Sequence, residues 1–144
     1  MLAADHDVAA ELWSVTSYKA LREEALSAER WNRLHPTDLA RTPWISEQLE
    51  ESQGPLVAVT DYMQMVPDQV ARWVPGQLTV LGTDGYGRSD TRARLRRHFG
   101  TDAEHVVVAV LKGLADGHDG KAEEVADAIA AYGIDADGIE PRLA

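Results

Sequence analysis

Apolar residues in this chain form three short runs, separated by longer stretches with helical spacing. The runs cover residues 11–16, 56–60 and 78–82. Each is rich in β-branched or aromatic side chains and ends at small or polar residues, as buried strands do. A Gly-Pro pair precedes the second run and a Pro-Gly pair precedes the third, where turns are expected. The pattern predicts three buried parallel strands.

Helical spacing of apolar residues predicts three helices between the strands. Ser17 is expected to cap the first, and Thr42 with Pro43 is expected to begin the second. The third is expected to break at Pro67, because proline lacks the N–H that a helix interior needs. The side chains predicted to face the core are Leu21, Ala25, Leu26, Trp44, Ile45, Leu49, Met63, Val66, Val70 and Trp73 or Val74.

The last third of the chain is predicted to be helical. A helix at about residues 91–99 is expected to end at Gly100 in the left-handed conformation. Residues 101–104 have the capping-box sequence that starts a helix, although the valines at 106–108 also favour a strand. The remaining predicted pieces are a turn at 117–120, a helix at 121–132 that ends at Gly133, and an irregular tail at 134–144.

Strands that alternate with helices predict an α/β fold, in which helices cover both faces of a mostly parallel sheet. A chain of 144 residues is the length of one domain, so we expect residues 1–144 to form a single unit. Residues 3–12 have the pattern of the end of a helix, with no strand before it. We therefore expect this domain to lack its first strand and helix.

The charge and the cysteine content limit which kinds of partner and which cellular compartment are expected. The chain has 24 acidic and 14 basic residues, a net charge of −10, which disfavours nucleic acid and anionic membrane surfaces. No apolar run approaches the ~20 residues that cross a bilayer. The absence of cysteine excludes disulfides and thiol catalysis, and it fits a reducing compartment. We therefore expect a cytoplasmic protein that binds neither nucleic acid nor membrane.

A glycine-rich turn at residues 82–90 is the most distinctive motif of the sequence. It follows a predicted strand and precedes a predicted helix, where backbone N–H groups can bind a phosphate or a carboxylate. Its spacing matches neither the dinucleotide nor the nucleotide fingerprint. The simpler alternative is a tight turn that needs glycine for positive φ, with Ser89 or Asp90 as helix cap.

Five of the eleven arginines fall between residues 88 and 97 of this acidic chain. They either form a positive patch for an acidic partner or a second subunit, or pair with carboxylates of the chain itself on a solvated helix. The five histidines lack the spacing of metal ligands, so we assign no metal site. The four tryptophans are expected to pack in the core or at an interface.

Several stretches in order along the chain resemble one enzyme family. They are WSVTS at 13–17, ERWN followed by LHP at 29–36, TDYM at 60–63, LGTDGYGRSD at 81–90, IDAD at 134–137 and PRLA at 141–144. Together they resemble the C-terminal domain of the homodimeric, thiamine-diphosphate-dependent pyruvate dehydrogenase, the decarboxylating first component of its complex. The resemblance covers essentially the whole chain.

The resemblance implies a three-layer α/β/α domain of the transketolase type. It implies a parent enzyme that decarboxylates pyruvate on thiamine diphosphate and reductively acetylates lipoyl groups. The family binds the cofactor and magnesium on a G-D-G…N-N motif of another domain, and neither G-D-G nor N-N occurs in this chain. We therefore assign no catalytic, cofactor-binding or metal-binding residue here, and we expect this part alone to be inactive and dimer-supporting.

The implied partners are the other domains and second subunit of the homodimer, and the dihydrolipoamide acyltransferase of the complex. Because ligands of α/β sheets gather at the carboxyl ends of strands, part of the glycine turn is a candidate for an interface or the rim of an active site. The residues of this 84–89 segment are Asp84, Gly85, Tyr86, Gly87, Arg88 and Ser89.

Two other functions remain open from the sequence. One is a non-enzymatic assembly module that docks onto a partner through the arginine-rich helix. The other is the C-terminal domain of a transketolase, which would share the fold but act on other substrates.

Overall fold

A pair of parallel strands lies at the centre of the molecule. The computed structural model describes residues 1–117 and 119–144. Strand β1 (Leu56–Val59) pairs with β2 (Leu78–Leu81), with Leu56 opposite Leu78. The Thr60 N–H donates to the Leu81 carbonyl at 3.0 Å and extends the ladder by one step. The second and third predicted strands are therefore confirmed, including their parallel direction.

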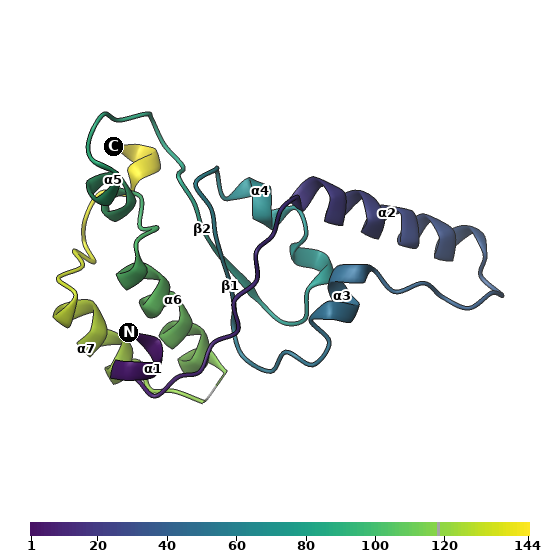
Figure 1. Ribbon diagram of the computed structural model, residues 1–144, viewed down its shortest axis with the longest axis horizontal. Helices are drawn as coiled ribbons and strands as arrows, with labels where there is room; N and C mark the ends of the chain where they lie inside the picture. Colours follow the sequence, from purple (N-terminus) through teal and green to yellow (C-terminus); the bar gives the residue numbers. More distant parts are fainter. Residues whose placement is uncertain (118) are drawn as a thin grey trace.

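Helices cover both faces of this sheet. They are α1 (Leu2–Asp5), α2 (Tyr18–Leu34), α3 (Trp44–Gln48), α4 (Met65–Asp68), α5 (Arg92–His98), α6 (Ala103–Asp116) and α7 (Ala122–Ala131), with short 3₁₀ helices η1 (Ala71–Trp73) and η2 (Pro141–Leu143). Helix α6 contacts both strands, and α4 contacts β2. In Figure 1, α5, α6 and α7 lie on one side of the sheet, and α2, α3 and α4 lie on the other. The three-layer α/β/α prediction is confirmed, with a sheet of two strands.

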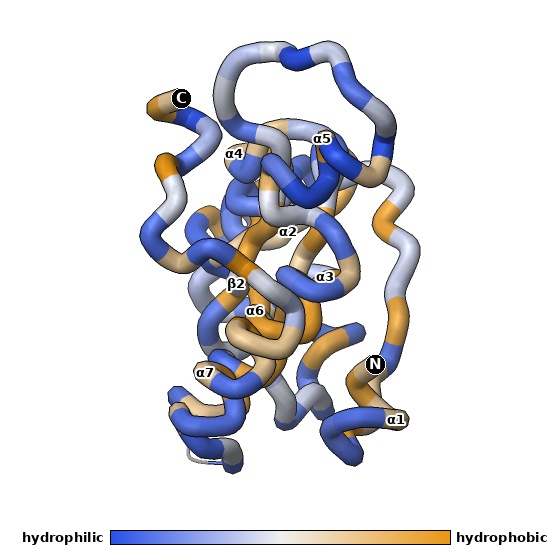
Figure 2. Tube along the Cα trace, turned by 90° about the vertical axis from the view of Figure 1, so that its left-hand side faces the viewer, coloured by the Kyte–Doolittle hydropathy of each residue, from blue (hydrophilic) through white to orange (hydrophobic). Residues whose placement is uncertain are grey.

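Two apolar clusters, one on each side of the sheet, form the core. The first consists of Ala25, Ile45, Val70 and Trp73, and the second of Val107, Leu111, Val125 and Ala128. Figure 2 shows hydrophobic chain gathered along β2 and α6, with hydrophilic turns around them. Each cluster joins helices that are consecutive or nearly so in the chain. The thin sheet is the only layer between them.

Trp73 stabilises the first cluster through both its side chain and its backbone. Its indole N–H donates to the Glu29 carboxylate at 2.8 Å, and its carbonyl accepts from the Ser46 hydroxyl at 2.6 Å. The same carboxylate accepts from Arg72 at 2.5 Å. Because Glu29 lies in α2 and Ser46 in α3, this one residue ties three elements together, as predicted for a tryptophan in the core.

Three helix ends follow the sequence prediction. The Ser17 hydroxyl accepts from Ala20 N–H at 3.1 Å and caps α2. Gly100 and Gly133 have φ values of +64° and +58°, which end α5 and α7 in the left-handed conformation. The valines at 106–108 lie in α6, so the helical alternative is correct there.

The predicted strand at 11–16 is wrong. These residues are irregular and exposed, with Leu12 93% and Trp13 52% accessible. In Figure 2 the chain leaving α1 runs along one side of the molecule, apart from the sheet. An apolar run becomes a strand only when a neighbouring strand satisfies its N–H and C=O groups, and this segment has no such neighbour among the described residues.

Three smaller predictions also need correction. The helical pattern at 3–12 forms only α1, which ends at His6. Pro43 rather than Thr42 is the N-cap of α3, where the Glu24 carboxylate accepts from Trp44 N–H at 3.0 Å. Trp44 is 48% exposed and lies off the core.

The third predicted helix is interrupted, as expected, but with a different boundary. It is divided into α4 and η1, and Pro67 lies inside α4 instead of starting a new helix. Met63, predicted to face the core, is 52% exposed, whereas Val70 is buried. Part of the predicted turn at 117–120 lies outside the described residues, because it contains His118.

The capping box predicted at 101–104 is shifted by one residue. Asp102 rather than Thr101 is the N-cap of α6, and its carboxylate accepts from His105 N–H at 3.0 Å. Thr101 N–H instead donates to the Arg96 carbonyl at 2.8 Å and closes the turn after α5. This turn directs the Thr101 side chain into the interior, away from the helix end.

Helix α6 lies unusually close to the start of β1. A Cβ atom added to Gly113 would lie 2.4 Å from the Pro55 Cβ atom. Only a residue without a side chain permits this approach, because real Cβ contacts of this kind are much longer. Gly113 is therefore the point at which the helix meets the sheet.

The substitution Gly113→Ala should lower the free energy of unfolding by about 1–3 kcal/mol, because the methyl group would overpack the contact with Pro55. Helix propensity alone predicts the opposite, a gain of about 1 kcal/mol. Urea unfolding monitored by tryptophan fluorescence measures the change.

The matched control is Gly54→Ala, because an added Cβ at Gly54 meets nothing within 4 Å. That variant should be within roughly 0.5 kcal/mol of the parent chain. A Gly113→Ala variant as stable as this control would show that α6 does not depend on the close contact.

Candidate functional site

The loops that follow the two strands meet at the carboxyl edge of the sheet. Thr83 N–H donates to the Tyr62 carbonyl at 2.9 Å, and the Thr83 hydroxyl donates to the Asp61 carbonyl at 2.7 Å. In the reverse direction, Gln64 N–H donates to the Asp84 carboxylate at 3.1 Å. These bonds hold the start of the glycine turn against the chain that leaves β1.

Glycine is required at two points of this edge. A Cβ atom on Gly82 would lie 2.8 Å from both the Tyr62 carbonyl oxygen and the Gln64 nitrogen. Gly85 has a φ of +125°, and a Cβ there would lie 2.5 Å from the Pro141 carbonyl oxygen. The turn is therefore held between the loop after β1 and the C-terminal η2 helix. This supports the tight-turn interpretation of the glycines.

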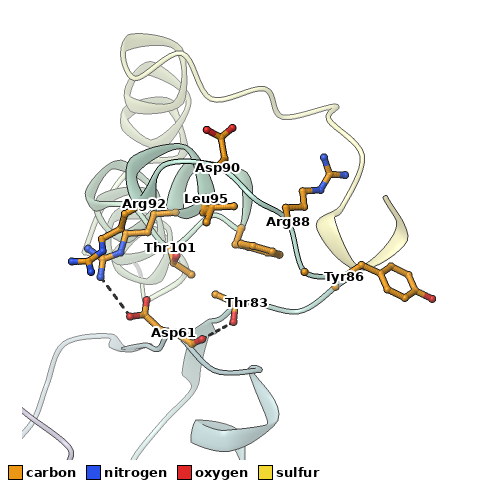
Figure 3. A pocket seen from close by; sticks show the side chains of 12 residues that line it. Asp61, Thr83, Tyr86, Arg88, Asp90, Arg92, Leu95 and Thr101 are labelled. Atoms are coloured by element: carbon orange, nitrogen blue, oxygen red, sulfur yellow. Dashed lines mark hydrogen bonds and ion pairs between the residues drawn. The ribbon is translucent and has the colours of Figure 1, made fainter.

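A pocket of about 510 Å³ lies between this turn and α5 (Figure 3). Its lining combines arginine and aspartate side chains with apolar groups from α5. The lining residues are Asp61, Thr83, Gly85, Tyr86, Gly87, Arg88, Asp90, Arg92, Leu95, Arg96, Phe99 and Thr101. Polar groups of both charges and an apolar floor give this pocket the composition of a small-molecule site.

The structure places the predicted 84–89 segment partly in the pocket. Gly85, Tyr86, Gly87 and Arg88 line it, whereas Asp84 is bonded to Gln64 N–H and Ser89 is not part of the lining. The segment is exposed except at Asp84, and Tyr86 is 79% accessible.

Sequence reasoning missed the other half of the pocket. Asp61 could have been found, because parallel strands place their following loops at the same edge. Leu95 and Phe99 fall within the helix predicted at about residues 91–99, which was not expected to line a pocket. No sequence signal pointed to Thr101, whose inward position depends on the turn after α5.

The helix after the turn is capped by a residue that the sequence analysis did not choose. The Thr91 hydroxyl accepts from Arg94 N–H at 3.4 Å, so neither Ser89 nor Asp90 is the N-cap of α5. The Asp90 carboxylate instead accepts from Thr91 N–H at 2.7 Å and lies 3.9 Å from Arg94.

The arginines divide into two groups. Arg94 pairs with Asp90, Arg96 lies 3.6 Å from Asp61, and Arg97 lies 3.3 Å from Asp102. Within residues 1–117 and 119–144, Arg88 and Arg92 have no carboxylate partner. Pairing with the chain's own carboxylates thus accounts for only three of the five.

Arg97 has a structural role that differs from those of its neighbours. One guanidinium nitrogen donates to the Tyr132 and Gly133 carbonyls at 2.6 and 2.7 Å, and the other donates to Asp102 at 3.3 Å. A cation at the C-terminal carbonyls of α7 also complements the helix dipole. Arg97 therefore joins α5, α6 and α7.

Asp102 is the acidic centre of this contact. Its burial acts to raise the pKa of the carboxyl, but hydrogen bonds from His105 and Arg97 outweigh burial and lower that pKa below its ordinary value of 3.8. The His105 ring nitrogen lies 2.5 Å from the carboxylate. Asp102 thus remains ionised well into the acid range.

Thr101 is the one buried polar residue in the pocket lining. It is 6% exposed, and within the described part of the chain its hydroxyl oxygen has no hydrogen-bond partner. Most buried hydroxyls in folded proteins are paired, so this one requires an explanation. Figure 3 shows Thr101 between Thr83 and the Arg92 side chain in the view into the pocket.

The histidines do not gather at the pocket. His35 bonds the Trp31 carbonyl at 3.0 Å, and His6 bonds the Tyr132 hydroxyl at 2.9 Å. His118 lies outside the described residues. Within the part of the chain that the structure describes, no group of three or more His, Asp or Glu side chains is placed to hold a metal ion, and no helix there is long and apolar enough to span a bilayer.

Comparison with known proteins identifies a family that matches this chain. The family described as the transketolase-like TK C-terminal domain matches residues 1–102. The pyruvate dehydrogenase E1 component of Mycolicibacterium smegmatis is 49% identical over 135 residues, which cover 94% of this chain and 14% of the relative.

Two further relatives carry the same name. Those of Pseudomonas aeruginosa and Escherichia coli K12 are 45% and 47% identical, and the matches cover 98% and 100% of this chain. Each match covers 16% of the relative. The chain thus spans about one-sixth of the length of the proteins that it resembles.

The substitution Asp102→Asn should lower the free energy of unfolding by about 1–2 kcal/mol at neutral pH, because it removes two charge-assisted bonds while asparagine keeps the helix cap. The folded-state pKa is lowered, so the ionised carboxylate stabilises the fold above pH 3.8. That stabilisation is lost as pH falls through the folded-state pKa.

The gap between Asp102→Asn and the parent chain should therefore close on acidification below 3.8, measured by urea unfolding at a series of pH values. Asp116→Asn is the control, because its pair with Lys112 is exposed. It should change stability by less than roughly 0.5 kcal/mol. A gap that persists in acid would contradict the role of the ionised carboxylate.

The substitution Thr101→Val should raise the free energy of unfolding by about 1 kcal/mol, because it removes a buried hydroxyl that lacks a partner. The same change at Thr91 should lower it by about 1 kcal/mol, because Thr91 caps α5. Thermal unfolding of the two variants compares them directly. A destabilised Thr101→Val chain would mean that the hydroxyl is satisfied in solution.

Proposed function

We propose, from the premise that this chain belongs to the transketolase-like TK C-terminal domain family, that it serves as the C-terminal domain of a pyruvate dehydrogenase E1 component. The parent enzyme would decarboxylate pyruvate and pass the acetyl unit to lipoyl groups. The observation that carries the proposal is 45–49% identity to three such enzymes over 94–100% of this chain. A transketolase is less well supported, because the relatives with this identity carry the pyruvate enzyme's name.

The cofactor chemistry is assigned to other parts of the parent enzyme. Thiamine diphosphate with magnesium would supply the carbanion chemistry of the decarboxylation. The chain contains neither G-D-G nor N-N, and its described residues offer no cluster of acidic and histidine ligands. We therefore route no catalytic step through these residues, and their role is to support the rest of the enzyme.

The carboxyl edge of the sheet is the surface that we propose to face the remainder of the parent. Three large side chains stand exposed there: Tyr62 at 72%, Met65 at 71% and Tyr86 at 79%. Tyr62 lies in the loop after β1, Met65 is the first residue of α4, and Tyr86 lies in the 84–89 segment. Clustered exposed apolar groups mark interaction surfaces, which supports an interface or active-site rim at this edge.

A second surface of this kind lies along residues 11–16. Leu12 is 93%, Trp13 52% and Val15 42% exposed. We propose that the other domains or the second subunit of the homodimer cover this surface. The dihydrolipoamide acyltransferase is the proposed partner of the assembled enzyme, which we place in the cytoplasm in line with the cysteine-free composition.

A chimera tests this function. The matching C-terminal stretch of the Mycolicibacterium smegmatis relative is replaced by this chain. The chimera should decarboxylate pyruvate with a kcat/KM within about tenfold of the native enzyme, which is a loss of about 1.4 kcal/mol or less. Carbon dioxide release with thiamine diphosphate and magnesium added is the measurement.

Deleting the same stretch from the relative should abolish activity, and the isolated chain should release no carbon dioxide. Calorimetry should show no binding of thiamine diphosphate to the isolated chain. A dimeric chimera that binds the cofactor but does not decarboxylate pyruvate would overturn the proposal. Activity of the isolated chain would overturn it equally.

A further inference from the structure

We propose that the pocket between the glycine turn and α5 binds a small monocarboxylate with an apolar body. The proposed function places an interface or active-site rim at this edge of the sheet but assigns no ligand to the pocket. The inference rests on an unpaired arginine, a buried hydroxyl without a partner and an apolar floor, which converge on one cavity of about 510 Å³.

Arg92 supplies the positive charge. It lines the pocket and has no carboxylate partner within the described ranges, whereas Arg94, Arg96 and Arg97 on the same helix are all paired. The planar guanidinium of Arg92 fits a carboxylate through two parallel hydrogen bonds.

The side chains around the pocket limit the charge of the ligand. Three arginines and two aspartates line it, so the pocket has one net positive charge. Asp61 already forms an ion pair with Arg96 at 3.6 Å. In Figure 3 the Arg92 side chain extends toward the side where Asp61 lies, and Arg88 extends to the opposite side. Arg88 also lacks a carboxylate partner among the described residues, but a lining with one net positive charge favours a monoanion over a dianion.

The buried hydroxyl of Thr101 supports a binding site independently of Arg92. It lines the pocket, it is more than nine-tenths buried, and its hydroxyl lacks a partner among the described residues. A buried hydroxyl without a hydrogen bond destabilises the fold. A carboxylate bound in the pocket that Thr101 lines would supply an oxygen to accept the hydrogen bond of this hydroxyl.

The floor of the pocket defines the rest of the ligand. Leu95 and Phe99 project from α5 and are only partly buried. A ligand ring or branched chain packed on them would remove apolar surface from water. The volume of about 510 Å³ lies in the range typical of small-molecule sites.

Titration of the full 144-residue chain with benzoate tests the inference. Calorimetry and amide NMR shifts monitor the binding. Benzoate combines a carboxylate with an apolar ring. Benzamide is the neutral probe of the same shape, and phenyl phosphate is the dianionic one. We expect benzoate to bind, benzamide not to bind, and phenyl phosphate to bind more weakly than benzoate.

Three variants locate the site. Arg92→Ala should weaken benzoate binding about tenfold or more, because it removes the charge-assisted bonds. Arg94→Ala, on the same helix but outside the pocket, should change the affinity less than about twofold, as a pair on the exposed surface would. Thr101→Val should weaken binding roughly threefold while it raises the melting temperature, so lost affinity cannot be attributed to lost folding.

Four results would overturn the inference. The first is no benzoate binding to a folded chain, and the second is equal binding to the native chain and to Arg92→Ala. The third is a set of NMR shifts that maps away from α5. The fourth is a phenyl phosphate affinity above that of benzoate, which would exclude the monocarboxylate class. Activity of the chimeric enzyme does not enter this test, so failure here leaves the proposed function intact.

Discussion

The parallel pairing of β1 and β2 is the contact on which the rest of the fold depends. An isolated pair of strands is marginal in water, so this sheet requires helices on both of its faces. Helix α6 covers one face of the sheet. At Gly113 this helix approaches Pro55 more closely than a residue with a side chain would permit. The other cover comes from the cluster around Val70 and Trp73. Without this pairing, the two apolar clusters would have no shared sheet to pack against.

The same pairing creates the functional edge. Because the strands run in parallel, the loops after both of them leave at one end, where Thr83 and Asp84 bond the backbone of residues 61–64. Arg97 then holds α5 to the end of α7. The pocket lies between these two fixed parts. Its geometry therefore depends on backbone bonds and one structural arginine, and its chemistry depends on the remaining side chains of α5.

Some local signals could be read correctly from the sequence, whereas features that depend on residues distant in the chain could not. Ser17, Gly100 and Gly133 act within one turn of their own helix, so their positions could be predicted from the chain around them. Residues 11–16 have the composition of a strand, but strand formation depends on a neighbour that composition does not reveal. The glycines pointed to the 84–89 segment. Asp61 and Thr101 join it only through tertiary packing, which no local pattern encodes.

The distribution of arginines separates the structural role of this domain from its proposed binding role. Arg97 is partly buried and bonded to two helix-end carbonyls and a carboxylate, so its charge is used within the fold. Arg92, five residues earlier, has the same side chain but no carboxylate partner among the described residues. Arg92 and Thr101 both line the pocket, and an external anion would be a partner for both groups.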